Sequence, residues 1–276
     1  MIKLIQGNCL EKMKDIANGS IDLTVTSPPY DNLRTYNDNN KQWDEHVWKQ
    51  TIKELYRVTK FGRVVVWIVC DATINGSETG TSFKQALWAM QCGFKLHDTM
   101  IWNKGSCRYP ETNRYYPTFE FMFIFSKGIP LVSNLIQDRR NIYSGSKIAR
   151  KRQMRKPNGE IVENSAYKKD KNRKVKDIGI RYNILNICVS ASENDKKALL
   201  HPASFPKKLA NDHILSWSNK GETILDPFMG SGTTGVACKL QRRNFIGIEL
   251  DPEYFKMAEK RITSINAIQD EIEWGE

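Results

Sequence analysis

The fold of this chain is set by the stretch IDLTVTSPPY, residues 21–30, which joins a strand to a stiff rim. Its first five residues are mostly apolar or β-branched, a pattern typical of a buried strand. Pro28 and Pro29 end that strand, since neither can donate a hydrogen bond to a sheet. We therefore expect the Ser27 hydroxyl, the Pro28 carbonyl and the Tyr30 ring to project into a cleft at the strand's carboxyl end.

These groups suit a flat base that is held by its exocyclic amine. The Ser27 hydroxyl and the Pro28 carbonyl can accept the two N–H bonds of such an amine, and the Tyr30 ring can stack on the base. A proline turn beside a core tyrosine would have the same short sequence. The stretch by itself therefore leaves both interpretations open.

A second stretch, DPFMGSGTTG at residues 226–235, follows a strand-like TIL and opens a helical pattern. Together the two stretches resemble the DNA amino-methyltransferases that use S-adenosylmethionine. Residues 27–30 match the family's catalytic (S/D)PP(Y/F) motif, and residues 226–234 match its DPFxGSGTT cofactor loop. The catalytic motif comes first here, which is the permuted order of the family's β group.

The resemblance covers nearly the whole chain and implies an α/β fold. The expected architecture is a Rossmann-like methyltransferase domain, with a mostly parallel sheet and helices on both of its faces. The catalytic residues that the resemblance implies are Ser27, Pro28, Pro29 and Tyr30. The cofactor-binding residues that it implies are Asn8, Cys9, Ser204, Phe205, Asp226, Pro227, Phe228, Gly230, Ser231, Gly232, Thr233, Thr234 and Glu249.

The glycine loop has a rival interpretation. It also satisfies the GxGxxG dinucleotide fingerprint, and Glu249 ends the next strand as a ribose-binding carboxylate should, which would fit an NAD-binding oxidoreductase. Asp226 before the turn can attract the ammonium of S-adenosylmethionine, and Phe228 offers an apolar wall. The Ser27 motif has no place in a dehydrogenase, so we favour S-adenosylmethionine.

Two polar residues at strand ends have alternative roles. In the family, the polar residue after the first strand contacts the cofactor adenine. Asp is usual there, so Asn8 is a departure, and it could equally cap a helix. Asp71 follows the apolar run 64–69 and could face the cofactor or the target base, or cap a helix.

The resemblance implies direct transfer of a methyl group to the exocyclic amine of a flipped base. No covalent intermediate is needed, and the Pro-Cys motif of carbon-5 cytosine enzymes is absent from the sequence. Ser at the first motif position is commoner in the N4-cytosine members, and Asp in the N6-adenine members. We therefore predict cytosine N4, with adenine N6 as the alternative. A non-catalytic nucleic-acid-binding relative and an RNA or protein methyltransferase are further alternatives.

The net charge of +11 is concentrated in one segment. Residues 139–182 hold fifteen Lys and Arg against four Asp and Glu, so the remainder of the chain is balanced. Such a run can be a solvated face. Beside a base-binding motif it favours contacts with the phosphates of double-stranded DNA. The DNA-binding residues that we predict are Arg150, Lys151, Arg152 and Arg155.

The order of the motifs predicts a discontinuous catalytic domain. Residues 1–128 and 201–276 would form it, and the basic stretch 129–200 would be an inserted target-recognition domain. Residues 31–44 are either a lid over the target base or a plain loop. The family's β group often dimerises, so a homodimer is a further prediction, although no segment of the sequence indicates an interface.

The composition of the chain indicates the cellular compartment of the protein. No stretch approaches the ~18 apolar residues of a membrane span, and the N-terminus enters a strand pattern directly, without the features of a signal peptide. The six cysteines are scattered and form no CxxC pair. We therefore predict a cytoplasmic protein with no membrane segment, no metal site and no disulfide framework.

Overall fold

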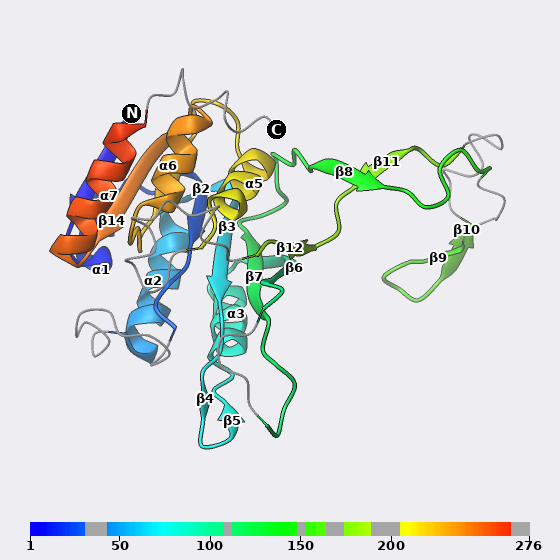
Figure 1. Ribbon diagram of the computed structural model, residues 1–276, viewed down its shortest axis with the longest axis horizontal. Helices are drawn as coiled ribbons and strands as arrows, with labels where there is room; N and C mark the ends of the chain where they lie inside the picture. The colour runs from blue at the N-terminus through cyan, green and yellow to red at the C-terminus, as the bar shows by residue number, and fades with distance from the viewer. Residues whose placement is uncertain (31–42, 107–111, 148–152, 164–173, 189–204, 266–276) are drawn as a thin grey trace. The chain divides into compact units, whose positions relative to one another are not determined.

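A computed structural model of the chain describes residues 1–30, 43–106, 112–147, 153–163, 174–188 and 205–265, apart from the side chain of Glu163. The chain divides into two compact units, Met1–Asn134 with Asn183–Glu276, and Leu135–Tyr182. The first unit is built on an eight-stranded sheet with the order β1-β14-β13-β2-β3-β7-β6-β12 (Figure 1). Its strands are β1 (Ile2–Gln6), β2 (Ile21–Thr26), β3 (Thr59–Val69), β6 (Lys95–Asn103), β7 (Phe119–Ser126), β12 (Ile184–Asn186), β13 (Thr223–Asp226) and β14 (Asn244–Glu249).

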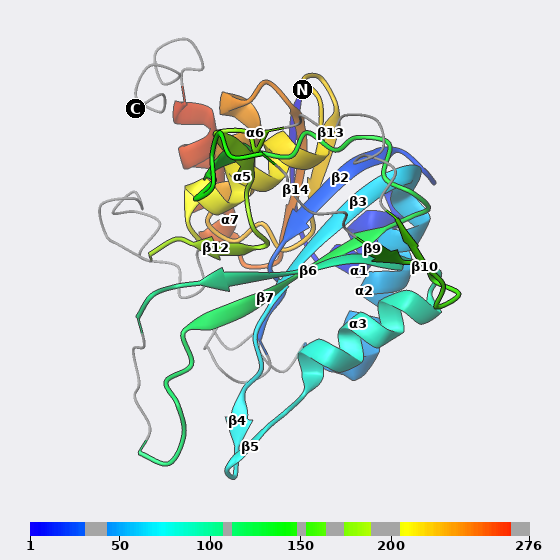
Figure 2. The same ribbon diagram turned by 90° about the vertical axis from the view of Figure 1, so that its right-hand side faces the viewer.

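Seven of the eight strands run in one direction, and β7 alone in this sheet is antiparallel to its neighbours β3 and β6. Helices cover both faces, as Figure 2 shows. One layer contains α5 (Lys207–Trp217), α6 (Thr233–Leu240) and α7 (Pro252–Ser264), and the other contains α1 (Cys9–Lys12), η1 (Met13–Asp15), α2 (Glu45–Val58) and α3 (Thr81–Gln91). The predicted fold class is confirmed.

The central strand β3 shows why both faces need helices. Val66 and Ile68 point into the core beneath α5 and α6, whereas Val65 and Trp67 point into the core beneath α2 and α3. Successive strand residues face opposite sides of a sheet. A strand that is apolar at every position is therefore stable only between two layers.

One detail of this strand differs from the sequence pattern. The sequence has helical spacing over residues 45–58, then Gly62 as a helix stop, then an apolar strand from Val64. The helix does end at Val58, but β3 already begins at Thr59. Gly62 lies inside β3 with φ of 75°, where the pairing with β2 shifts its register. Glycine adopts this conformation without steric cost, so it forms a bulge here rather than a helix stop.

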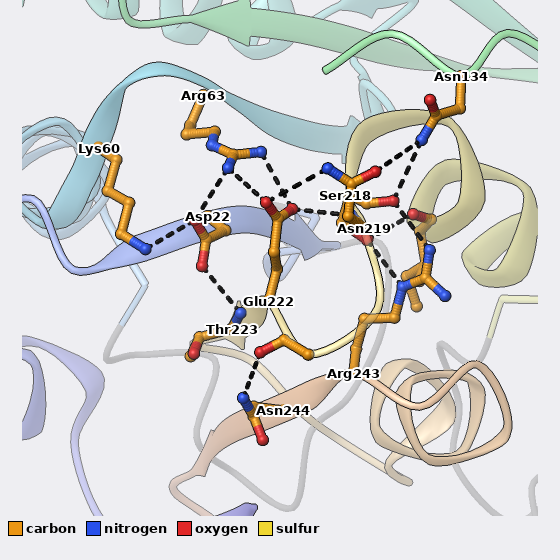
Figure 3. Close-up of polar contacts among 12 residues, drawn as sticks. Asp22, Lys60, Arg63, Asn134, Ser218, Asn219, Glu222, Thr223, Arg243 and Asn244 are labelled. Atoms are coloured by element: carbon orange, nitrogen blue, oxygen red, sulfur yellow. Dashed lines mark hydrogen bonds and ion pairs between the residues drawn. The ribbon is translucent and has the colours of Figure 1, made fainter. Parts of the chain in front are cut away.

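The amino ends of the central strands are tied together by ion pairs, drawn in Figure 3. Asp22 on β2 is 3% exposed, and its carboxylate pairs with Lys60 at 2.7 Å and with Arg63 at 3.4 Å. Arg63 also binds Glu222, with Nη1 3.0 Å from Oε2. Asp22 in addition accepts a hydrogen bond from the backbone N–H of Thr223, at 2.9 Å. The buried Asp22 and the half-buried Glu222 at this amino edge are therefore neutralised by side chains of the protein itself.

The second unit consists of short antiparallel pairs. β8 (Gln137–Arg140) pairs with β11 (Ile178–Ile180), and β9 (Gln153–Arg155) pairs with β10 (Ile161–Glu163). Arg181 pairs with Asp138, and the Arg139 guanidinium lies over the Tyr182 ring. A further hairpin of the first unit joins β4 (Thr73–Ile74) to β5 (Ser77–Glu78).

Candidate active site

The two motifs meet at the carboxyl edge of the sheet. β1, β14, β13 and β2 are neighbouring parallel strands, so their carboxyl ends lie at one edge, where open α/β sheets bind ligands. The last residues of these strands are Gln6, Glu249, Asp226 and Thr26. Ser27 follows directly, so the structure brings together the catalytic and cofactor stretches that the sequence separates by about two hundred residues.

Asp226 makes a hydrogen bond that joins the two stretches. Its Oδ1 accepts hydrogen bonds from the Thr26 hydroxyl at 2.7 Å and from the Phe228 backbone N–H at 3.1 Å. Its Oδ2 accepts a hydrogen bond from the Thr234 hydroxyl at 2.8 Å. Thr26 precedes Ser27, and Thr234 lies in the first turn of α6. Asp226 therefore connects the strand that ends at Ser27 to the start of the cofactor helix.

The carboxylates of this edge carry raised pKa values. Asp226 is 1% exposed, and burial raises its pKa to about 6. Burial also raises the pKa of Glu249 to about 7, although the backbone N–H groups of Gly230 and Asp251 donate to its carboxylate. Neither group forms an ion pair with a side chain in the described part of the chain. A ligand that carries positive charge could form the ion pair that these two carboxylates lack, and would favour their ionised forms.

The glycine turn is shaped by its neighbours. Gly230 and Gly232 have φ of 52° and 82°, a conformation that side chains disfavour. A Cβ on Gly232 would lie 2.9 Å from the Cβ of Ala258 on α7, so α7 packs directly against the turn. Arg261 of the same helix donates a hydrogen bond to the Ser231 carbonyl. The start of α6 is thus held so that its backbone can approach a ligand closely.

The catalytic stretch forms a chain of hydroxyl groups. Ser27, which is partly exposed, donates to the Tyr30 hydroxyl at 2.7 Å, and Tyr30 donates to Oε2 of Glu120 at 2.7 Å. The Tyr30 ring is 4% exposed and packs in the core that α2 and α3 cover. The structure therefore describes the polar contacts of the Tyr30 hydroxyl, and stacking of the Tyr30 ring on a base stays a prediction.

Other predicted cofactor residues lie around this edge. Asn8 accepts a hydrogen bond from the Leu10 backbone N–H at 2.9 Å and caps α1, which is the alternative that the sequence left open. Cys9 is buried with its sulfur 4.0 Å from the Thr51 hydroxyl, and burial raises its pKa to about 11. Phe205 packs in the core beneath α5.

Several predictions fall elsewhere. Ser204, Arg150, Lys151, Arg152 and most of the segment 31–44 lie outside the described residues. Arg155 is exposed and ends β9 in the second unit. Asp71 accepts hydrogen bonds from the Ser82 backbone N–H at 2.8 Å and the Thr79 hydroxyl at 3.3 Å, so it satisfies the start of α3.

Three residues near the site were not predicted from the sequence. Glu120 is 2% exposed on β7 and pairs with Lys104 at 3.1 Å. Its only signal is an acidic residue within the otherwise apolar stretch FEFMFIF. Trp43 packs edge-on against Phe228 with ring centroids 5.2 Å apart, and its buried indole N–H has no hydrogen-bond partner among the described residues. No sequence pattern distinguishes Trp43 from a core tryptophan.

The described residues contain no group of three or more His, Cys, Asp or Glu side chains that could hold a metal ion. Among the same residues no helix is both long and apolar enough to cross a membrane.

Comparison with known proteins identifies the chemistry of this edge. The family model described as DNA methylase, for N6 and N4 methyltransferases, matches residues 21–260. The chain belongs to this family. The orphan methyltransferase M.BamHII of Bacillus amyloliquefaciens is 50% identical over 251 residues, which cover 90% of this chain and 91% of that protein. The chain is therefore a DNA amino-methyltransferase with S-adenosylmethionine as its methyl donor, and the oxidoreductase alternative is excluded.

Solved structures share the fold at low sequence identity. PvuII DNA methyltransferase, described as cytosine-N4-specific, matches with a TM-score of 0.68 and 20% identity, over 97% of this chain and 89% of that one. TTHA0409 from Thermus thermophilus, complexed with S-adenosyl-L-methionine, matches with a TM-score of 0.62 and 20% identity, over 95% of each chain. These similarities support the same fold over nearly all of the chain.

Proposed function

We propose that this DNA methyltransferase modifies the exocyclic N4 amine of cytosine in double-stranded DNA. The observation that carries the proposal is the position of Ser27, which follows β2 one residue after the Thr26–Asp226 hydrogen bond. A serine there, in place of the aspartate of most N6-adenine members, supports cytosine. Adenine N6 is the second candidate, because both bases present an exocyclic amine and both side chains accept hydrogen bonds.

The chain's own residues would position the amine. The Ser27 oxygen and the Pro28 carbonyl accept its two N–H bonds and draw the nitrogen toward tetrahedral geometry, which frees its lone pair. S-adenosylmethionine, when bound, would supply a methyl group activated by positively charged sulfur, which would keep the electrons of the broken S–C bond as a neutral thioether. The amine would release one proton to water as it gains this methyl group. Catalysis by Ser27 and Pro28 would thus consist of orientation and fixed dipoles.

The residues of the glycine edge fit this cofactor. Asp226 is buried and Glu249 is half-buried, neither carboxylate has a cationic partner in the described chain, and the cofactor has a sulfonium and an ammonium group. The Glu249 oxygens keep lone pairs for ribose hydroxyls beyond their two backbone bonds. Phe228 and Trp43 supply aromatic surface beside the loop. We include the remaining residues that the resemblance implies in the same proposed site, among them Phe205, the turn 230–234 and Asn8, which departs from the family's usual aspartate.

The proposal extends to the basic segment and to the setting of the enzyme. The second unit, Leu135–Tyr182, lies within the stretch 129–200 that we propose as the target-recognition region. β12 is also inside that stretch, but it pairs with β6 in the main sheet. The cytoplasm is the proposed location, and homodimerisation stays a prediction.

Mass spectrometry of nucleosides tests the target base. Duplex DNA, single-stranded RNA and a protein mixture are incubated with the full chain and isotopically labelled S-adenosylmethionine. We expect label in N4-methylcytosine from duplex DNA. Label in N6-methyladenine would identify adenine, in place of cytosine, as the target base. Cofactor binding without label in any sample would favour the non-catalytic alternative.

A salt titration tests the role of the basic segment. If residues 139–182 contact phosphates, DNA affinity should fall with salt at roughly −0.9 in log–log slope for each contact. Replacing Arg150, Lys151, Arg152 and Arg155 by glutamine should make the slope shallower and weaken specific and non-specific DNA alike. Equal affinity and parallel lines for the variant and the wild type would show that the run is a solvated face.

A further inference from the structure

The hydroxyl chain beside Ser27 ends on a buried ion pair. Ser27 donates to the Tyr30 hydroxyl, Tyr30 donates to Oε2 of Glu120, and Oε1 of Glu120 lies 3.1 Å from the Lys104 ammonium. Tyr30 and Glu120 are both almost fully buried, at 4% and 2% exposed. Ser27 is the partly exposed end of this chain, so the chain runs from the surface of the site into the core.

The direction of the hydrogen bonds follows from the group at the buried end. An ionised carboxylate only accepts hydrogen bonds, so the Tyr30 proton must point to Glu120. The Tyr30 oxygen is then an acceptor, and it takes the single proton of Ser27. The Ser27 oxygen is left with lone pairs alone for any further partner. An amine that offers N–H bonds needs an acceptor at that position.

From this geometry we propose that Glu120 is a positioning residue, which acts through Tyr30 to fix the Ser27 hydroxyl as a hydrogen-bond acceptor for the target amine. The inference rests on the proposed function of Ser27. Lys104 takes part because its ammonium compensates the charge of the buried carboxylate. Glu120 itself is separated from Ser27 by the Tyr30 hydroxyl and contributes only the polarity of the chain.

The substitution Glu120→Gln reverses this polarity without changing the size of the side chain. The Lys104 ammonium attracts the carbonyl oxygen of the introduced amide, so the amide N–H group turns to Tyr30. Tyr30 then accepts that hydrogen bond and donates to Ser27, whose own proton is driven toward the amine. The Ser27 O–H and an N–H of the target amine would then face each other as two donors. The amine would lose its acceptor at Ser27 and be held less well.

A double-mutant cycle of kcat with duplex DNA tests the proposal. We expect kcat to fall about a hundredfold in Glu120→Gln and only about tenfold in Tyr30→Phe, where Ser27 can rotate freely. The double variant should return to about the level of Tyr30→Phe, because the amide no longer reaches Ser27. The KM for S-adenosylmethionine should stay within about twofold in all three variants, because the chain does not touch the glycine turn.

The matched control is Asp22→Asn, the same carboxylate-to-amide change at a residue that is also buried and also paired with a lysine. It should lower the melting temperature and leave kcat unchanged. Additive losses of kcat in the cycle, or a wild-type kcat in Glu120→Gln, would overturn the inference about Glu120. The proposed function would still stand in that case, provided that the wild-type enzyme yields labelled methylated base. If Glu120→Gln does not fold by circular dichroism, Tyr30→Phe is compared in the Ser27→Ala background. The effect of Tyr30→Phe should vanish there, and a persisting loss would equally overturn the inference.

Discussion

Carboxylates that are buried or half-buried have opposite kinds of partner at the amino and carboxyl edges of the sheet. At the amino edge, Asp22 and Glu222 both contact the guanidinium of Arg63, as Figure 3 shows. At the carboxyl edge, Asp226 and Glu249 are held by hydroxyl and backbone N–H groups, and burial raises their pKa values to about 6 and about 7. The same sheet thus neutralises its acids at one edge and leaves them uncompensated at the other.

This difference separates stability from binding. A buried carboxylate without a cation costs free energy in the ligand-free protein, and a cationic ligand recovers that cost when it binds. A carboxylate that is already paired gains nothing from a ligand. Substitutions at the carboxyl edge should therefore change activity or cofactor affinity, and substitutions at the amino edge should change the free energy of unfolding.

The largest expected effect is that of Ser27→Ala. Removing the hydroxyl takes away one acceptor of the amine, so kcat should fall by about a hundredfold or more. Affinity for S-adenosylmethionine, measured by calorimetry, should be unchanged, because Asp226 and the glycine turn keep their contacts. Wild-type turnover in this variant would remove Ser27 from the catalytic role.

The next effect belongs to the amino edge. Arg63→Ala leaves Glu222 without its guanidinium partner and Asp22 with Lys60 alone, so chemical denaturation should show a loss of about 3 kcal/mol in the free energy of unfolding. The kcat of the folded variant should match the wild type. A variant that stays stable but loses turnover would mean that the amino edge is coupled to the site.

Most of the fold could be predicted from the sequence, because most of its helices and strands have a local pattern of apolar residues of their own. The helical spacing of residues 45–58 and the apolar run 64–69 correspond to α2 and to most of β3. The stretch NFIGIE at residues 244–249 is typical of a strand, and it corresponds to β14 residue for residue. β12 was not predicted, because a strand of three residues at a sheet edge leaves no readable period.

Residues of the candidate active site could be predicted only where they belong to a continuous sequence motif. The stretches at 27–30 and 226–234 were found because they are continuous strings, and the sheet then brought them together. The hydrogen bond of Tyr30 with Glu120 joins residues 90 positions apart, and that of Thr26 with Asp226 joins residues 200 apart. Such pairs depend on strand order, which a single sequence does not contain.

The smallest expected effect, and the most direct test of the uncompensated edge, is a proton count. Asp226 and Glu249 bind protons more tightly in the folded chain than in the unfolded chain, since their pKa values rise from 3.8 to about 6 and from 4.5 to about 7. The contribution of these two carboxyls to the free energy of unfolding should therefore fall as pH rises from about 4 to about 7, whereas buried His213, whose pKa burial lowers to about 4, contributes in the opposite direction. A bound cation favours the ionised carboxylates, so cofactor binding should release protons in the upper part of this range.

Calorimetric titration of S-adenosylmethionine at pH 6.5, in buffers of different ionisation enthalpy, measures that release. We expect a fraction of one proton to be released at pH 6.5 and none at pH 8.5, where both carboxyls are already ionised and the cofactor's amine takes up protons instead. The ammonium of the cofactor, with an ordinary pKa of about 8, is already charged at pH 6.5 and takes up little. Glu249→Gln should reduce the release, whereas Asp22→Asn at the paired edge should preserve it. Binding without proton release in the wild type at pH 6.5 would mean that the cofactor's charge does not compensate these carboxylates, and the contrast between the two edges would then concern stability alone.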